Sequence, residues 1–327
     1  MAAVVQEHYD AEPEAVLRTA RLPRPGIGRG EVLVRVRASS VDRGTWHLMA
    51  GLPYAVRAVS GLRGPKLPNP GRNIAGVVEA VGPDVTGFAP GDAVYGTAAA
   101  AFAEYAAARP DRIAPKPTGL TFEEAATVPV SALTALQAVR DKGKVQEGQQ
   151  VLITGAAGGV GTYAVQLAHA FGAHVTAVAS MPKLDTVRTL GADHAIDYTR
   201  EDFLVGPRRY DAVIDIAGNR GLRDLRRALT PRGRLVITGG ETNGRWLGGT
   251  DRQLRAQMVS PFTRQHLGTF IASEHADGLR DLTGLIEAGA LSPVMDRIYP
   301  LAETATAIRH LLDGRVTGKL ALTLPAE

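Results

Sequence analysis

The sequence contains no cysteine among its 327 residues. Disulfides, thiolate zinc sites, iron–sulfur clusters and a cysteine nucleophile are therefore excluded. Long apolar runs are missing too: the longest, Ala93 to Ala108, carries Glu104 and is shorter than the ~18–20 residues that a membrane span needs. The first ten residues lack the basic region and apolar core of a secretory signal. We therefore expect a cytoplasmic protein without a membrane partner.

The chain also has little excess of either charge: it contains 37 Lys and Arg and 33 Asp and Glu, which gives a net charge of +4. The densest basic stretch has no interleaved aromatic residues, and we interpret it as a solvated helix face rather than a nucleic-acid-binding surface. It comprises Arg220, Arg223, Arg226, Arg227, Arg232 and Arg234. No nucleic-acid partner is expected.

The length is that of about two domains at ~100–200 residues each, and the pattern changes along the chain. Short β-like runs such as 31–36 and 75–81 predict an antiparallel β domain first. Thr121 and Glu124 form a capping box, and strands and helices then alternate, which predicts a doubly wound parallel sheet. In this series the expected strands are 151–154, 174–178, 211–216, 234–238 and 269–272, and the expected helices are 160–171, 183–190, 221–229 and 279–288. The tail that follows, with 296–300, a helix at 303–312 and a strand at 320–324, is similar to the first domain again.

A glycine-rich loop gives the most specific signal. Val151 to Gly161 reads VLITGAAGGVG, so an apolar strand leads into glycines and then into a helix. Such a loop lets the backbone turn sharply, approach a pyrophosphate closely and direct unpaired helix N–H groups to the anion. Because the loop lies within a series of alternating strands and helices, we interpret it as a dinucleotide-binding loop and not as a structural turn.

The end of the second strand of that series indicates which dinucleotide is bound. NAD-binding proteins place an acidic residue there to bind the ribose hydroxyls. Here the residues after Val178 are Ala179, Ser180, Met181, Pro182 and Lys183, and the nearest acid, Asp185, is expected inside the next helix. A hydroxyl and an ammonium suit a 2′-phosphate, so we predict NADPH. The alternative for Lys183 is a solvated lysine at a helix start.

Several motifs together resemble one family. GRNIAGVVEAVGPDVTGFAPGDAVYG from Gly71, ITGAAGGVGTYAVQLA, LGADHAIDY and GRVTGKLAL resemble the zinc-independent quinone oxidoreductase branch of the medium-chain dehydrogenase/reductase superfamily. The resemblance implies an α/β fold, with a GroES-like antiparallel β catalytic domain in residues 1–120 and 268–327. It also implies a Rossmann NADPH-binding domain in residues 121–267, a homodimer and a small-molecule substrate. The implied reaction transfers a hydride from NADPH to a quinone or an α,β-unsaturated carbonyl.

The resemblance also implies that no metal takes part. Zinc-dependent relatives carry an early cysteine and a His-Glu pair after the glycine that corresponds to Gly71. This chain has Arg72 and Asn73 there and no cysteine. We therefore expect no metal site.

The cofactor-binding residues follow from the same resemblance. Gly158, Gly159 and Val160 match the pyrophosphate-binding positions, and Ser180, Lys183 and Tyr198 match those that hold the 2′-phosphate and ribose. The nicotinamide side is matched by Thr134, Ala217, Phe270 and Lys319. Core packing is an alternative for Phe270, and a hydrogen bond to its own helical turn is one for Thr134.

One departure from the family pattern concerns the catalytic residues. Many relatives carry Asn-Pro-x-Asp, where this chain has Asp42-Arg43-Gly44-Thr45. An ionised Asp42 can anchor a ribose hydroxyl, but it has no proton to donate to an oxyanion. We expect Tyr54 to be the donor, with a packing role for Tyr54 and proton supply by water or a ribose hydroxyl as alternatives. Residues 52–70 and 241–262 are expected to border the substrate pocket.

Two other functions stay open. The chain can be a zinc-free carbonyl or alcohol oxidoreductase of specialised metabolism, in which C=O takes the hydride. It can also be a nucleotide-binding protein with little turnover.

Overall fold

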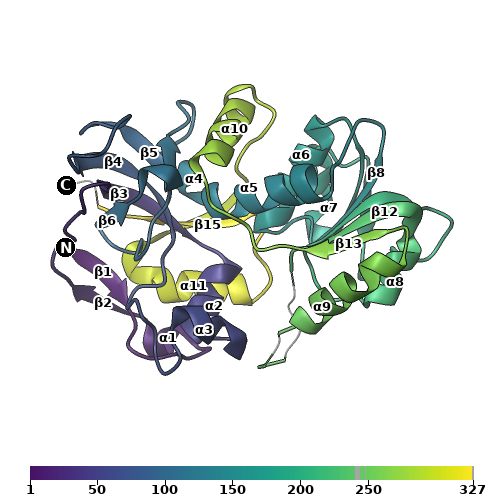
Figure 1. The fold of residues 1–327 in the computed structure, drawn as a ribbon, viewed down its shortest axis with the longest axis horizontal. Helices are drawn as coiled ribbons and strands as arrows, with labels where there is room; N and C mark the ends of the chain where they lie inside the picture. The colour runs from purple at the N-terminus through teal and green to yellow at the C-terminus, as the bar shows by residue number, and fades with distance from the viewer. Residues whose placement is uncertain (240–243, 247, 326–327) are drawn as a thin grey trace. The chain divides into compact units, whose positions relative to one another are not determined.

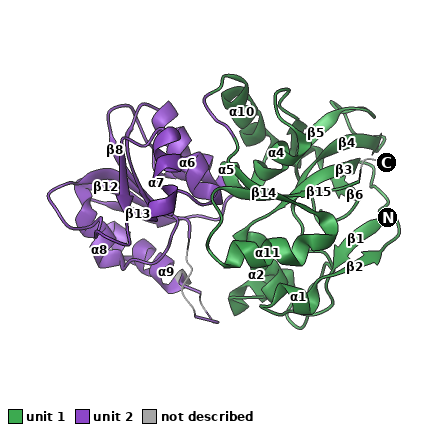
Figure 2. Cartoon of the chain, turned by 180° about the vertical axis from the view of Figure 1, so that it is seen from behind, with its two compact units in different colours: residues 1–133, 274–289, 293–327 green, residues 134–273, 290–292 purple. Residues whose placement is uncertain are grey.

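The computed structural model describes residues 1–239, 244–246 and 248–325. These residues form two compact units, shown in separate colours in Figure 2. Unit 1 comprises residues 1–133, 274–289 and 293–327, and unit 2 comprises residues 134–273 and 290–292.

Unit 1 is built on an almost entirely antiparallel sheet. Among the described residues its strand order is β14-β15-β3-β4-β5-β7, with β6 paired to β3, and only β14 and β15 run parallel. The strand predicted at residues 31–36 is confirmed within β3, but its burial alternates only in part: Val32, Val34 and Val36 are buried and Arg35 is half-buried, while Leu33 is buried as well. The strands are β3 (Val32–Val41), β4 (Asn73–Val81), β5 (Ala93–Thr97), β6 (Tyr105–Ala108), β7 (Ile113–Pro115), β14 (Met295–Pro300) and β15 (Lys319–Thr323), beside a separate hairpin of β1 (Ala2–Val5) and β2 (Arg18–Arg21).

Helices cover this sheet, as Figure 1 shows, and they include segments distant in sequence. The capping box predicted at Thr121 and Glu124 is confirmed at the start of α4. Near the end of the same helix, the carbonyl of Ala126 accepts from Ser40 Oγ of β3 at 2.8 Å. Tyr95 of β5 donates to the Leu279 carbonyl of α10 at 2.7 Å. The helices of unit 1 are α1 (Pro13–Val16), α2 (Arg43–Ala50), η1 (Tyr54–Val56), α3 (Arg57–Ser60), η2 (Pro110–Arg112), α4 (Phe122–Thr127), α10 (Ala276–Glu287), η6 (Leu301–Glu303) and α11 (Thr304–Leu312).

The two units divide at 133/134 and 273/274, whereas the expected domain boundaries lie at 120/121 and 267/268. Helix α5 (Pro129–Leu136) crosses the first division and continues into a π-helical segment, η3 (Gln137–Lys142). The domain boundaries themselves stay predictions.

Unit 2 contains the predicted doubly wound parallel sheet. The strand order is β10-β9-β8-β11-β12-β13 and all described pairs are parallel. Helices α6 and α7 lie on one face, and α8 and α9 lie on the other (Figures 1 and 2). The strands are β8 (Gln150–Thr154), β9 (His174–Ala179), β10 (His194–Asp197), β11 (Tyr210–Asp215), β12 (Leu229–Ile237) and β13 (His266–Thr269), and the helices are α6 (Gly159–Ala170), η4 (Met181–Lys183), α7 (Leu184–Thr189), α8 (Leu222–Ala228), α9 (Thr250–Val259) and η5 (Ser260–Phe262).

One predicted strand was wrong. Residues 269–272 were expected to be extended in the sheet, but β13 ends at Thr269, which pairs with Ile237 at the end of β12. Among the residues that the structure describes, the pairing ends there, and Ile271 is almost fully exposed. The sequence misled because Phe270 and Ile271 have high β propensity although no neighbouring strand extends that far.

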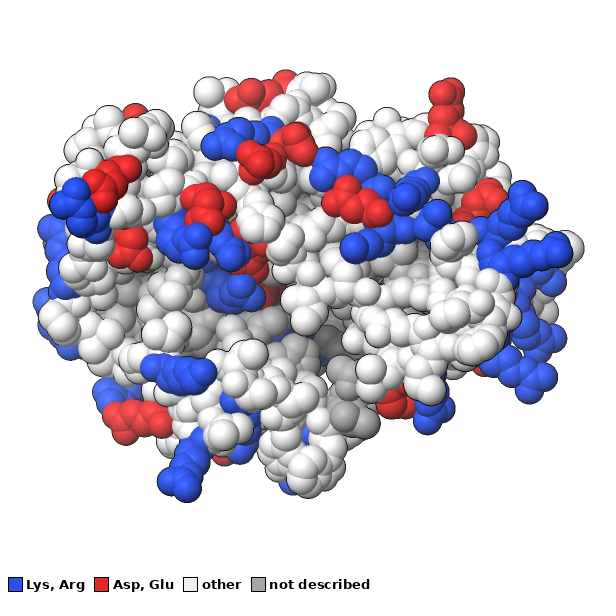
Figure 3. Space-filling view, in the orientation of Figure 1, with Lys and Arg blue, Asp and Glu red and all other residues white. Residues whose placement is uncertain are grey.

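The arginine-rich segment around α8 is exposed only in part: Arg223, Arg227 and Arg232 are exposed, whereas Arg220, Arg226 and Arg234 are half-buried. Figure 3 shows Lys and Arg gathered in this region. Two of its arginines have specific partners: Arg220 pairs with Asp202 at 3.2 Å, and Arg226 donates to Gln265 at 3.2 Å. In the described part of the chain, every helix is too short or too polar to cross a lipid bilayer.

Candidate functional site

The glycine loop of unit 2 connects β8 to α6 as predicted. Gly155 begins the turn in the left-handed region, with φ 65°, and Gly158 is the N-cap of α6 without a side-chain cap. A Cβ on Gly161 would lie 2.1 Å from the Gly155 carbonyl oxygen, so only glycine permits this approach of helix to loop. The first N–H groups of an α-helix have no intrahelical partner. The loop therefore has the backbone shape and the free donors that a pyrophosphate requires.

The loop lies at the point where the strand order reverses. Strands β9 and β10 extend the sheet on one side of β8, and β12 and β13 extend it beyond β11. In open parallel sheets, ligands bind at the carboxyl ends of the strands beside such a point. Residues 158–160 begin α6 there, directly after β8.

A buried polar network lies at the same ends of β8 and β11. Thr154 donates to Asp215 at 2.7 Å and accepts from the backbone N–H of Ala217 at 3.2 Å. Asp215 is fully buried and pairs with Arg252 of α9 at 2.6 Å. Arg252 also donates to the Gly239 carbonyl at 2.9 Å. Sequence reasoning missed this network, although an acid at the end of an apolar strand could have indicated it.

The three residues predicted to hold the adenosine 2′-phosphate lie together. Ser180 directly follows β9, Lys183 ends the following 3₁₀ turn, and the backbone N–H of Lys183 donates to the Ser180 carbonyl at 2.9 Å. Tyr198 directly follows β10 and donates from its backbone to Ala179 at 3.2 Å. Its side chain is 51% exposed. The register of two adjacent strands thus brings the three positions to one end of the sheet.

An acid that sequence reasoning did not weigh lies beside them. Asp197 is the last residue of β10 and pairs in register with Ala179. It is 5% exposed, and its Oδ1 accepts from the N–H and the hydroxyl of Thr199 at 3.0 and 2.8 Å. The Thr199 hydroxyl is the main cause that lowers the pKa of Asp197. This carboxylate is therefore bonded to its own turn, while Asp185 lies inside α7 and pairs with Arg188.

The residues predicted for the nicotinamide side divide between the units. In unit 2, Ala217 is the second residue after β11 and Phe270 directly follows β13, so both lie at the carboxyl ends of strands. Thr134 lies in α5 and is half-buried. Lys319 belongs to unit 1.

In unit 1, Asp42 is a buried N-cap. Its Oδ1 accepts from the N–H of Thr45 at 2.8 Å, and this bond caps the first turn of α2. Its Oδ2 accepts from Asn73 Nδ2 at 2.9 Å. Asn73 in turn accepts from the N–H of Val130 at 3.0 Å. Both carboxylate oxygens are thus already used in holding α2, β4 and the start of α5, a structural role that sequence reasoning did not foresee.

A buried cation accompanies this carboxylate. Lys319 is 2% exposed, and its Nζ donates to the carbonyl of Val41, the residue before Asp42, at 3.0 Å. Burial alone would raise the pKa of Asp42, but the attraction of Lys319, the two hydrogen bonds and the more distant Arg72 together lower it. Burial lowers the pKa of Lys319, and Asp42 opposes that shift. Asp42 is therefore an anion with no proton to donate.

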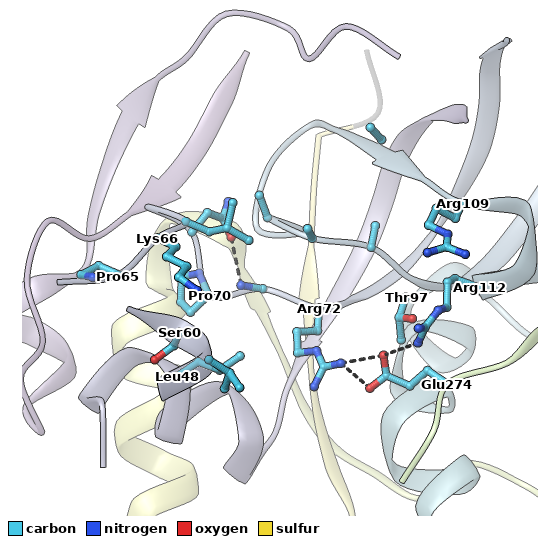
Figure 4. Close-up of a pocket in the computed structure, with 18 of the residues that line it drawn as sticks. Leu48, Ser60, Pro65, Lys66, Pro70, Arg72, Thr97, Arg109, Arg112 and Glu274 are labelled. Atoms are coloured by element: carbon cyan, nitrogen blue, oxygen red, sulfur yellow. Dashed lines mark hydrogen bonds and ion pairs between the residues drawn. The ribbon is translucent and has the colours of Figure 1, made fainter. Parts of the chain in front are cut away.

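Unit 1 also contains a cavity of about 650 Å³. Arg72, the residue after Gly71, lies at its centre in Figure 4 and holds both oxygens of Glu274, at 2.5 and 2.6 Å. Arg112 approaches the same carboxylate at 3.7 Å. The segment 52–70, which is expected to border the substrate pocket, contributes to the wall of this cavity through Val59, Ser60, Pro65, Lys66, Leu67, Asn69 and Pro70.

Comparison with known proteins identifies the family. Residues 28–138 match the model of the alcohol dehydrogenase GroES-like domain, and residues 190–322 match that of the zinc-binding dehydrogenases. The 2-methylene-furan-3-one reductase of Solanum lycopersicum is 32% identical over 313 residues, which cover 91% of this chain and 73% of that protein. The chain belongs to the quinone oxidoreductase-like branch of the medium-chain dehydrogenase/reductase superfamily.

Two further proteins are similar to this chain, one in structure and one in sequence. The quinone oxidoreductase of Coxiella burnetii superposes with a TM-score of 0.86 at 29% identity, covering 99% of this chain and 100% of that one. The spectinabilin polyketide synthase system protein NorB of Streptomyces orinoci is 36% identical over 309 residues. Those residues cover 91% of this chain and 13% of NorB, so the chain spans only a small part of that relative.

In the part of the chain that the structure describes, this quinone oxidoreductase-like protein lacks the usual zinc ligands of one of the two families whose models it matches. The model of that family is described as zinc-binding, yet the described residues contain no group of three or more His, Asp or Glu side chains that could hold a metal ion. At the position of the His-Glu pair of zinc relatives, Arg72 binds Glu274 and Asn73 binds Asp42.

Tyr54, the expected proton donor, is not one of the residues that line the cavity. It begins η1, and its ring packs against the Arg57 guanidinium, 4.8 Å from Cζ to the ring centroid. Arg57 also packs on Tyr9 and donates to the Gly51 carbonyl at 3.0 Å, which fixes the orientation of both rings. Its role as a donor stays a prediction.

The second segment expected to border the pocket lies only partly within the described residues. Residues 241–243 and 247 lie outside them. Trp246, Met258 and Phe262 are strongly exposed.

Proposed function

We propose that this chain is an NADPH-dependent reductase that transfers a hydride to a quinone or an α,β-unsaturated carbonyl without a metal ion. The observation that supports this most is the glycine loop at the reversal of the parallel sheet, with Ser180, Lys183 and Tyr198 at the adjoining strand ends. The loop fits a pyrophosphate, and the three side chains offer two hydroxyls and an ammonium to a 2′-phosphate.

Lys183 provides the test of cofactor choice. A charge-assisted contact to phosphate is worth about 1.5–3 kcal/mol, so Lys183→Ala should weaken NADPH binding about ten- to a hundredfold. Binding of NADH, which has no 2′-phosphate, should hardly change. Fluorescence titration of the reduced nicotinamide measures both dissociation constants. Lys142→Ala, which removes an exposed lysine elsewhere in unit 2, is the control. Equal losses for both cofactors would contradict the assignment.

The chemistry that this chain must provide is stabilisation of an oxyanion. When bound, NADPH supplies the hydride, and negative charge then develops on the substrate's carbonyl oxygen, which needs hydrogen-bond donors and finally a proton. Asp42 is an anion with both oxygens engaged and donates nothing, so it positions α2 and remains a candidate ribose anchor. We propose the Tyr54 hydroxyl as the proton donor.

Tyr54→Phe removes that hydroxyl and keeps the ring that packs on Arg57. We expect kcat to fall about tenfold or more, because a positioned general acid contributes roughly 10²–10⁴, while the NADPH dissociation constant stays unchanged. Steady-state kinetics with a cofactor titration measures both. A Phe variant that turns over at the parent rate would exclude Tyr54 and favour water or a ribose hydroxyl.

The names of the relatives support an activated double bond as the acceptor. One relative is a 2-methylene-furan-3-one reductase and another is a quinone oxidoreductase. The arrangement of Arg72 and Asn73 supports a reaction without zinc, because neither residue is a usual zinc ligand.

A substrate panel tests the proposal directly. Purified protein is mixed with NADPH and either quinones, enones or saturated carbonyls while the absorbance of the reduced nicotinamide is followed, before and after dialysis against a strong chelator. We expect loss of absorbance with quinones or enones at a rate that the chelator leaves unchanged. Loss only with saturated carbonyls would support carbonyl reduction instead. Tight NADPH binding without turnover would support a nucleotide-binding protein.

A further inference from the structure

The cavity of unit 1 has more positive than negative side chains on its wall, and Figure 4 labels five of these six charged residues. Four are cationic and two are carboxylates: Lys66, Arg72, Arg109 and Arg112 against Glu31 and Glu274. Arg109 is paired with Asp111, outside the wall, at 2.7 Å, so the surplus comes from the other three cations. This excess of positive charge would attract an anionic ligand and would not help an uncharged, apolar one to bind.

Both carboxylates are already engaged. Glu274, whose side chain is 8% exposed, accepts two hydrogen bonds from Arg72 Nη2 and lies 3.7 Å from Arg112. Glu31 accepts from the N–H of Gly28 at 2.8 Å. Arg72 uses only Nη2 for Glu274, which leaves the N–H groups of Nε and Nη1 with no acceptor among the described residues. The Lys66 ammonium has none there either. Arg72 and Lys66 can therefore donate to an anion in the cavity.

Much of the remaining wall is apolar. It includes Leu48, Val59, Pro65, Leu67, Pro70 and the alanines at 98–100. Val59 and Leu67 are 73% and 52% exposed, which places uncovered apolar surface on the same cavity as the cations. A ligand with an apolar body would cover these side chains while its charged end reached the guanidinium.

Gln6 gives a second, independent sign of a polar ligand. It lines the cavity, is 1% exposed and donates from Nε2 to the Met49 carbonyl at 3.2 Å. That bond fixes the orientation of the amide, so Oε1 is the carbonyl oxygen. It is buried with no donor among the described residues. A buried acceptor left unpaired is costly, and a ligand hydroxyl or amide N–H would satisfy it.

We propose that this cavity is a binding site for an anionic substrate: a molecule with an apolar body and a carboxylate or phosphate group held by Arg72 and Lys66. A guanidinium presents planar, paired donors that match either anion, and charge-assisted hydrogen bonds are the strong ones. That the bound molecule is also reduced rests on the proposed function, whereas its binding does not.

Calorimetric titration of the full chain with hexanoate, hexyl phosphate and hexan-1-ol tests the binding without any reaction. We expect at least one anion to bind about ten- to a hundredfold more tightly than the alcohol, and the tighter anion identifies the group. Binding should weaken with added salt. Equal binding of all three, or no binding of either anion, would overturn the proposal.

Substitutions of Lys66 and Arg72 test whether these two side chains bind the anion. Lys66→Gln changes an exposed side chain, so the fold should persist, and it should weaken binding of the preferred anion about tenfold while leaving hexan-1-ol unaffected. Arg72→Gln should weaken it further. Lys142→Gln, an exposed lysine in unit 2, is the matched control and should change nothing. Anion binding that survives both cavity variants would contradict the assignment.

Kinetics with trans-3-benzoylacrylate and its ethyl ester connects the site to the reaction, because the ester keeps the enone and removes the negative charge. The ester group also makes the double bond more electrophilic, so a preference for the acid cannot come from intrinsic reactivity. We expect kcat/KM to be at least about tenfold higher for the acid, and Lys66→Gln to remove this preference through KM. Equal kcat/KM values would contradict an anionic substrate. If neither enone is reduced while the alkyl anions bind, the proposed function fails and the anion site stands.

Discussion

A Lys319→Met variant should be less stable than the parent by up to about 3 kcal/mol at pH 7, the lower end of the cost of removing one partner of a buried charge pair. The lower end applies because Lys319 attracts Asp42 while its hydrogen bond goes to the Val41 carbonyl. Lys319 is 2% exposed, and its positive charge attracts the negative charge of Asp42, which is 9% exposed. Methionine fills a similar volume, so the loss would come from leaving Asp42 as a buried, uncompensated anion. Urea unfolding followed by far-ultraviolet circular dichroism measures the difference.

The pH dependence of this effect has a definite sign. In the parent, the pKa of Asp42 is lowered in the fold, so its contribution to stability is present above the unfolded pKa of about 3.9 and is lost as pH falls through the folded value. In the variant, burial acts without the attraction of Lys319 and raises the pKa of Asp42. The variant therefore loses stability as pH rises above about 4. The gap between parent and variant should be widest near pH 7 and narrow toward pH 4.

A second substitution separates charge from packing. Asp42→Asn combined with Lys319→Met removes both charges, and asparagine is also a good N-cap, so the double variant should recover most of the lost stability. Arg29→Met, which breaks an exposed pair with Asp84, should change little. A gap that is independent of pH, or a double variant as unstable as the single one, would show that Lys319 acts through packing.

Gly161→Ala should weaken binding of both NADPH and NADH by about a hundredfold or more. The new Cβ would lie 2.1 Å from the Gly155 carbonyl oxygen and 2.7 Å from backbone atoms of Ala156, so the loop must move. Moving it misaligns the N–H donors, each worth about 1.5–3 kcal/mol toward an anion. Forcing the backbone apart should also cost about 1–3 kcal/mol of stability. Cofactor titration and thermal unfolding measure the two effects.

Gly158→Ala separates these two effects. Gly158 has φ −85° and ψ 178°, which alanine adopts freely, and its Cβ would meet the Gly155 oxygen at an ordinary 3.4 Å. Stability should therefore persist while the methyl group hinders the pyrophosphate. Gly268→Ala in β13, with nothing within 4 Å, is the control for both measurements. Unchanged cofactor affinity in both loop variants would exclude this loop as the dinucleotide site.

The sequence could predict the part of the site that local geometry determines. The loop of residues 155–161 needs glycine at position 161 because a Cβ there would collide with backbone atoms of the same loop. Ser180 and Lys183 follow one strand within a single turn. Tyr198 could be added because LGADHAIDY resembles the family. In each case a short segment carries the whole arrangement, so spacing or resemblance alone locates it.

The rest depends on contacts between residues that are distant in the chain. Arg72 and Glu274 are 202 positions apart, and Lys319 and Val41 are 278 apart, so no spacing rule pairs them. Arg72 was recognised only as a missing zinc ligand, whereas the fold makes it part of a cationic cavity wall. The end of β13 was misplaced for the same reason, because it is set by where β12 stops and not by the propensity of Phe270 and Ile271.

The most direct test of the central claim is where the hydride goes. NADPH carrying deuterium at the transferred position of the nicotinamide is mixed with the protein and an enone, and the product is analysed by mass spectrometry and deuterium NMR. We predict one deuterium on the β-carbon of a saturated ketone, with a much lower yield when equally labelled NADH replaces NADPH. Deuterium on a carbinol carbon, or no labelled product despite NADPH binding, would contradict the account.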